Sequence, residues 1–115
     1  MKKSWFLSSF FLFTLCITSV YSQIYFENGT CKCPNATVGD STTISGTTYT
    51  AVNNSTIAGQ ISATINTTGA ANYNLCTTLV TNMSSLFENY TSFNSNIGFW
   101  DTSNVTNMSA MFREA

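Results

Sequence analysis

The sequence predicts an α/β chain in which a small β-hairpin plus helix cap precedes the start of a repeat solenoid. Three observations predict this order: threonine-rich runs on both sides of Ser45-Gly46, apolar residues four apart from Ile57 onward, and an eight-residue motif that recurs 25 positions later. At 115 residues, the chain has room for one small domain after any leader. We divide it into a leader over 1–22, a lead-in and cap over 23–78 and a repeat region over 79–115.

Residues 1–22 have the pattern of a secretory signal peptide. Two lysines are followed by an apolar run over 5–17, which is shorter than the about 20 residues that cross a membrane. The small Ser22 predicts cleavage between Ser22 and Gln23, and a retained membrane anchor is the alternative. A lipid anchor on Cys16 is disfavoured, because Leu15 is not the small residue that signal peptidases require before the cut. We therefore expect no stable membrane insertion after cleavage.

Composition after the leader disfavours nucleic-acid binding and catalysis. Two basic and five acidic side chains remain, which gives a net charge of −3, a poor surface for nucleic acid. The chain has no histidine, the usual general base and the commonest metal ligand, and Asp101 has no second carboxylate nearby in the sequence. We expect a protein that is not an enzyme and that holds no cofactor.

The cap is predicted from two segments. Residues 42–52 place Ile44, Tyr49 and Val52 among threonines around Ser45-Gly46, which predicts a hairpin. The spacing of Ile57, Ile61 and Ile65, after polar residues suited to a helix N-terminus, predicts a helix over about 55–65. Residues 23–35 are interpreted as an irregular lead-in.

The repeat lies at 80–87, Val-Thr-Asn-Met-Ser-Ser-Leu-Phe, and at 105–112, Val-Thr-Asn-Met-Ser-Ala-Met-Phe, with six identities in eight positions. Apolar residues at i, i+3 and i+4 predict a short helix in each copy, and a short strand is expected at Val105. A period of 25 is typical of a leucine-rich-repeat-like solenoid, in which each unit buries its apolar face only against its neighbours. The expected repeat core is Val80, Met83, Leu86, Phe87, Phe93, Ile97, Trp100, Val105, Met108, Met111 and Phe112.

Residues 93–112 carry a specific resemblance. The run Phe-Asn-Ser-Asn-Ile-Gly-Phe-Trp-Asp-Thr-Ser-Asn-Val-Thr-Asn-Met-Ser-Ala-Met-Phe resembles the consensus of the BspA-like repeat surface proteins of bacteria, roughly SFNxDIxxWDxSNVTxMSxMFxxA. Residues 79–87 are similar to a degenerate first unit of that family. Asn96 departs from the aspartate common there. The resemblance implies a leucine-rich-repeat solenoid and a role in adhesion or surface recognition, with a protein or surface ligand that the motif does not identify.

Three cysteines remain after the leader, and an exported compartment favours disulfides over free thiols. Cys31 and Cys33 are too close to bridge each other comfortably, so one of them is expected to pair with Cys76. We prefer Cys33, because Pro34 fixes the chain direction beside it, and Cys31 is the alternative. A zinc or redox site is the rival hypothesis, but a single Cys-x-Cys with no histidine is weak support, so no metal site is predicted.

Two polar and aromatic patterns have competing interpretations. Asn-x-Ser/Thr recurs along the chain and could mark glycosylation, but the repeated Asn82 and Asn107 favour a structural role, with side-chain amides bonding turn backbone from coil to coil. Tyr90, Phe99 and Trp100 could form a ligand-binding patch, although aromatic residues at repeat spacing more often fill a core.

The leading hypothesis is an exported, non-catalytic adhesion or protein-recognition module, secreted or displayed on the outer surface of a bacterium. The alternative is a structural stalk, or an accessory region of a larger exported protein whose functional domain follows residue 115. We also expect the array to continue past residue 115 and residues 105–115 to be frayed without a further coil.

Overall fold

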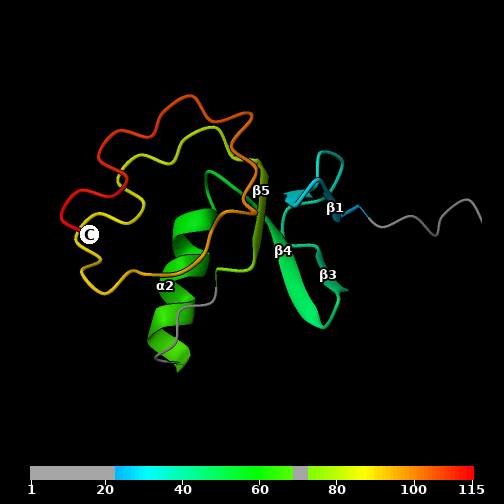
Figure 1. The fold of residues 1–115 in the computed structure, drawn as a ribbon, viewed down its shortest axis with the longest axis horizontal. Helices are drawn as coiled ribbons and strands as arrows, with labels where there is room; N and C mark the ends of the chain where they lie inside the picture. The colour runs from blue at the N-terminus through cyan, green and yellow to red at the C-terminus, as the bar shows by residue number, and fades with distance from the viewer. Residues whose placement is uncertain (1–22, 69–72) are drawn as a thin grey trace, which may run out of the picture.

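The structure is a computed structural model that describes residues 23–68 and 73–115, with side chains of the helix described up to residue 62. It is a small compact domain of strands with one short helix, arranged as two small sheets (Figure 1). Ser22, on one side of the predicted cleavage site, lies outside the described residues. The elements in chain order are β1 (Tyr25–Glu27), β2 (Thr30–Lys32), β3 (Ser41–Ile44), β4 (Thr47–Asn53), α2 (Ile57–Thr68) and β5 (Leu75–Leu79).

The hairpin predicted around Ser45-Gly46 is confirmed. Strands β3 and β4 pair antiparallel, with Ile44 opposite Thr47. Both turn residues have positive φ, 51° at Ser45 and 84° at Gly46, as the two-residue turns that match the twist of a hairpin require. Cross-strand hydroxyl pairs add polar contacts on the exposed face, including 2.8 Å between Thr43 Oγ1 and Thr48 Oγ1.

The predicted helix is confirmed and is longer than expected, since α2 extends to Thr68. Its N-terminus is capped by Asn53, whose Oδ1 accepts the N–H groups of Ser55 and Thr56 at 3.0 and 3.1 Å. Ile57 and Ile61 are buried, as their spacing predicted. The side chain of Ile65 lies outside the described residues.

The lead-in is a second hairpin that the interpretation of residues 23–35 missed. Strands β1 and β2 pair antiparallel, and the turn between them is Asn28-Gly29, with φ of 51° and 80°. Asn-Gly between strands is a strong short-range signal for such a turn. Cys31 N–H donates to the carbonyl of Phe99 at 2.8 Å, which ties this hairpin to the repeat region.

Strand β5 pairs parallel with β4, and their register has the same period as the sequence repeat. Thr50 lies opposite Leu75 and Ala51 opposite Cys76, a separation of 25 residues in each pair. The strand–helix–strand unit of β4, α2 and β5 therefore occupies one repeat length. One core joins this unit to the repeat region, with Val52, Ile57 and Ile61 packed in the same cluster as Val80 and Phe87.

The prediction of a short helix in each repeat copy is wrong. Residues 83–90 and 108–115 form successive turns, in which Leu86, Glu88 and Tyr90 donate N–H to the carbonyls three residues earlier. Positive φ recurs at Ser85 and Asn89 and, 25 residues later, at Ala110 and Glu114. A helix would direct every N–H to the carbonyl four residues earlier, but alternate N–H groups here leave the coil.

The expected strand at Val105 is reduced to one parallel bridge between Asn82 and Asn107. Residues 105–115 were expected to fray, but backbone hydrogen bonds place them against the preceding copy. Figure 1 shows these two segments, yellow and red, running side by side away from β5. We call residues 80–90 the first coil and residues 105–115 the second coil.

Candidate functional site

The two coils are joined by a regular ladder of backbone hydrogen bonds. N–H groups of the first coil at alternate residues donate to carbonyls of the second coil: Met83 to Asn107, Ser85 to Ser109, Phe87 to Met111 and Asn89 to Arg113, at 2.8 to 2.9 Å. At the start of the ladder the direction reverses, and Thr106 N–H donates to the Thr81 carbonyl at 2.8 Å. Every rung joins residues 24 or 25 positions apart, so the coils stack in parallel and in register.

Side chains repeat the same stacking. The rings of Phe87 and Phe112 lie parallel, with centroids 5.6 Å apart and an interplanar angle of 6°. Arg113 forms an ion pair with Glu88, the residue at its own position in the first copy. The pKa of the Glu88 carboxyl is lowered by hydrogen bonds from Ser85 and Arg113. Both apolar and charged positions thus face their counterparts in the other coil.

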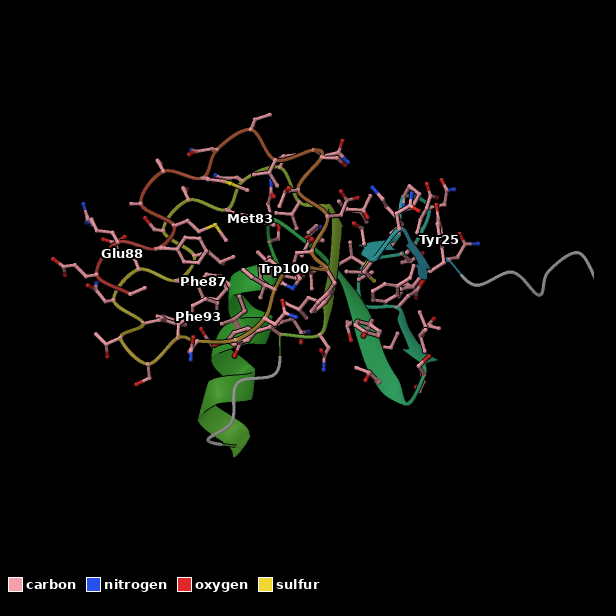
Figure 2. The ribbon with its side chains drawn as sticks, in the orientation of Figure 1. Tyr25, Met83, Phe87, Glu88, Phe93 and Trp100 are labelled. Carbon is pink, nitrogen blue, oxygen red and sulfur yellow. The ribbon has the colours of Figure 1, made fainter. Side chains whose placement is uncertain are left out.

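The predicted repeat core divides into a buried and an exposed part. Figure 2 shows Met83, Phe87, Phe93 and Trp100 grouped between the coils and α2. Met108 and Phe112 differ from the expectation, since they are 46% and 50% exposed whereas their counterparts Met83 and Phe87 are almost fully buried. The cause is their position, because the described chain places nothing on the far side of the second coil. Val80, Met83, Phe87, Trp100 and Met111 are buried, and Leu86, Phe93, Ile97 and Val105 pack partly buried against them.

The far side of the second coil, which we call the open face, also carries unused hydrogen-bond donors. The residues at the same repeat positions as the four donors of the first coil are Met108, Ala110, Phe112 and Glu114. Among the described residues, none of their N–H groups has an acceptor. The open face therefore combines two exposed apolar side chains with a row of free N–H groups at alternate residues.

Repeated asparagines hold the coils in shape. The Oδ1 atoms of Asn82 and Asn107 each accept the N–H two residues later, at 2.9 Å, within their own coil. The expected bonding of these two amides from coil to coil is therefore not seen. Other asparagines provide it: Asn54 Oδ1 accepts Thr81 N–H at 2.9 Å, and Asn104 Nδ2 donates to the Thr78 carbonyl at 2.8 Å.

Asp101 is a buried carboxylate that links three parts of the fold. Its side chain is 3% exposed, and Oδ2 lies 3.2 Å from Lys32 Nζ of β2, although no hydrogen bond of good geometry reaches that oxygen. Oδ1 accepts the N–H and the hydroxyl of Ser103. Burial alone would raise the pKa of Asp101, but hydrogen bonds from Ser103, Thr78 and Lys32 outweigh burial and hold the pKa at about 2. Asp101 is thereby committed to a structural ion pair.

The three cysteines come together, as the disulfide hypothesis requires, without being bonded. Cys31, Cys33 and Cys76 are fully buried in one cluster, near one another but not at disulfide distance. The Cys76 thiol is within hydrogen-bonding reach of both of the others. The bond with Cys76 raises the pKa of Cys33, and burial adds to it; Cys31 and burial raise the pKa of Cys76 to about 12. Pairing of Cys76 with Cys33 or Cys31 stays a prediction.

The aromatic residues considered for a ligand patch separate. Trp100 is in the core, where its Nε1 donates to the Tyr73 carbonyl at 2.9 Å, and Tyr90 is half-buried against Phe87. Phe99 is half-buried at the other sheet, in edge contact with Tyr49 at 5.6 Å and 6.3 Å from Phe26. Sequence reasoning missed the exposed aromatic pair of β1, Tyr25 and Phe26.

Metal-binding and membrane-spanning features were sought in the described residues. No group of three or more Cys, Asp, Glu or His side chains in this part of the chain is arranged to hold a metal ion. No helix there has the length and apolar character needed to cross a membrane.

Together, the fold and the coil ladder define a small domain in which repeat coils stack on a strand–helix–strand unit of the same length. A family model matches residues 55–115, from the start of α2 to the second coil, and the chain belongs to that family, described as Mycoplasma protein of unknown function, DUF285. No curated protein and no solved structure matches the chain.

Proposed function

We propose that this chain is an exported, non-catalytic recognition module, displayed at a bacterial surface and built as the start of a leucine-rich-repeat-like solenoid similar to the BspA-like proteins. The observation that carries the proposal is the constant register: the first coil pairs with the second at a separation of 24 to 25 residues, and β4 pairs with β5 at 25. Solenoids are built by such nearest-neighbour stacking, and they present extended surfaces suited to protein recognition.

The use of the ionisable side chains supports a non-catalytic role. Asp101 is paired with Lys32, and Glu88 is paired with Arg113. The thiols of Cys33 and Cys76 are buried with raised pKa values, which disfavours the reactive thiolate. These groups serve packing and coil pairing, whereas a catalytic acid, base or nucleophile must reach a substrate.

Export is tested by expressing the whole chain with a C-terminal tag in a bacterial host and fractionating the cells. We expect the tag outside the cytoplasm and a first residue of Gln23 by N-terminal sequencing. A Leu12→Lys variant, which interrupts the apolar run of the leader, is the matched control and is expected to stay inside. Cytoplasmic wild-type chain beginning at Met1 would overturn the export part of the proposal.

Recognition is tested separately with the exported protein. Cells that display the chain are compared with cells that display the Phe87→Ala variant, in which the buried centre of the coils is removed, for attachment to immobilised protein and glycan panels. Attachment that requires the folded coils supports recognition. Equal attachment by both cell types across every panel would leave the stalk hypothesis in its place.

A further inference from the structure

The open face of the second coil is complementary to a chain segment with the same repeat motif. Each feature of that face has a counterpart in the first coil that is already satisfied: Met83 and Phe87 are 1% and 0% exposed, whereas Met108 and Phe112 are 46% and 50% exposed. The four donors of the first coil all have carbonyl partners in the second coil, and the equivalent four N–H groups have none among the described residues. The contact between the two coils is therefore a template for what the open face lacks.

We propose that the open face binds a separate polypeptide segment carrying the Val-Thr-Asn-Met-Ser-x-x-Phe motif, which stacks in parallel as an additional coil. In this arrangement, N–H groups of Met108, Ala110, Phe112 and Glu114 donate to alternate carbonyls of the incoming segment. Its phenylalanine ring stacks on Phe112 as Phe112 stacks on Phe87. The inference goes beyond the proposed function and does not depend on export.

The polarity of the backbone excludes a symmetric alternative. In the ladder, the first coil provides donors and the second coil provides acceptors, apart from the reversed rung at Thr106. Two open faces brought together would place N–H groups against N–H groups and leave both rows unsatisfied. The partner must offer its carbonyl side, which is the side that the second coil presents to the first.

Addition of a strand or coil to a free backbone edge is an established mode of peptide recognition, in which main-chain hydrogen bonds provide affinity and side-chain contacts provide specificity. Here the specificity lies in methionine and phenylalanine four residues apart, which match Met108 and Phe112. Charge can extend the match, because Glu88 and Arg113 already alternate along the stack.

The test uses the whole chain and a fluorescein-labelled peptide with the sequence of residues 79–93, titrated by fluorescence anisotropy. We expect saturable binding that weakens at least about tenfold when the peptide methionine and phenylalanine are both replaced by serine. The Met108→Ser/Phe112→Ser double variant of the chain is expected to lose binding. Tyr25→Ser is the matched control, since Tyr25 is also exposed and lies at the other end of the molecule from Glu88 (Figure 2).

Amide hydrogen exchange provides a second measurement that does not depend on a variant remaining folded. Bound peptide is expected to slow exchange at Met108, Ala110, Phe112 and Glu114 of the wild-type chain, in an alternating pattern. Equal binding of the serine-substituted peptide, or slowing without this alternation, would overturn the proposal. A peptide-independent dimer that the double variant abolishes would also overturn it, because the open face would then be occupied symmetrically.

Discussion

Lys32 and Asp101 form an ion pair, with Nζ 3.2 Å from Oδ2, that joins the hairpin of β1 and β2 to the repeat region. The backbone beside Asp101 strengthens this connection, since its carbonyl accepts the Thr77 hydroxyl at 3.0 Å. Thr77 belongs to β5, so a single residue of the repeat contacts both sheets. The fold therefore depends on one buried charge at the point where its parts meet.

Acid is expected to destabilise the fold through Asp101. Its pKa is about 2 in the folded chain and near 3.8 when unperturbed, so the ionised carboxylate contributes stability that is fully present above about pH 4 and lost as pH falls towards 2. The difference corresponds to about 2 kcal/mol in the free energy of unfolding. Urea unfolding followed by circular dichroism from pH 6 to pH 2 measures it.

The matched control for acid sensitivity is Asp101→Asn, which keeps the shape of the side chain but removes its charge. We expect this variant to be less stable than wild type at pH 7 and to lose most of the acid-dependent step. An Asp101→Asn protein with the same pH profile as wild type would show that other carboxylates account for the acid sensitivity.

Local turn chemistry explains how much of the cap could be predicted. Ser45-Gly46 between threonine-rich runs and the four-residue spacing of Ile57 and Ile61 gave the hairpin and the helix, because both signals are contained in a few adjacent residues. Asn28-Gly29 carries an equally local signal, which the interpretation overlooked. The parallel pairing of β4 with β5 joins residues 25 apart, and no local pattern identifies it except the repeat period itself.

The repeat was recognised in the sequence, but its conformation was not. The i, i+3, i+4 spacing of Met83, Leu86 and Phe87 fits a helix, and it fits equally a coil of successive turns in which positions 83 and 87 face inward. Coil-to-coil hydrogen bonding decides between them, and it depends on the neighbouring copy. Lys32–Asp101 was likewise out of reach, since nothing in the sequence places β2 beside residue 101.

Asn82 is expected to stabilise the first coil through one side-chain hydrogen bond. Replacing it by alanine removes the acceptor for Ser84 N–H, 2.9 Å away, and should lower the free energy of unfolding by about 1 kcal/mol. Asn94→Ala is the control, because Asn94 is exposed and has no side-chain hydrogen bond among the described residues. Equal stability of the two variants, measured by urea unfolding, would remove the structural role assigned to Asn82.

Exported protein is expected to contain a disulfide between Cys33 and Cys76, with Cys31 as the alternative partner. The burial of all three side chains in one cluster allows either pairing after a small movement. Closing the loop from Cys33 to Cys76 should stabilise the fold by about 4 kcal/mol in the chain-entropy model. Peptide mapping without reduction identifies the pair.

Alkylation of the unfolded, unreduced protein provides the count. One reactive thiol is expected, on the cysteine left out of the bridge. In the reduced and folded control, reaction at pH 7 should be slow, because Cys33 and Cys76 are buried with raised pKa values. Three reactive thiols in freshly exported, unfolded protein would reject the disulfide.

Phe87 and Phe112 occupy the same repeat position in different surroundings, and this makes them a direct test of coil stacking. Phe87 is fully buried and contacts the rings of Tyr73, Phe93 and Trp100, so Phe87→Ala should cost about 3–5 kcal/mol of unfolding free energy. Phe112 is 50% exposed and has its stacked contact on one side, so Phe112→Ala should cost about 1–2 kcal/mol. Urea unfolding of both variants measures the difference. If a further motif-bearing segment occupies the open face, added peptide should increase the cost of Phe112→Ala and leave that of Phe87→Ala nearly unchanged. Equal costs for the two variants without peptide would contradict the stacked arrangement, because the sequence position would then matter more than the neighbouring coil.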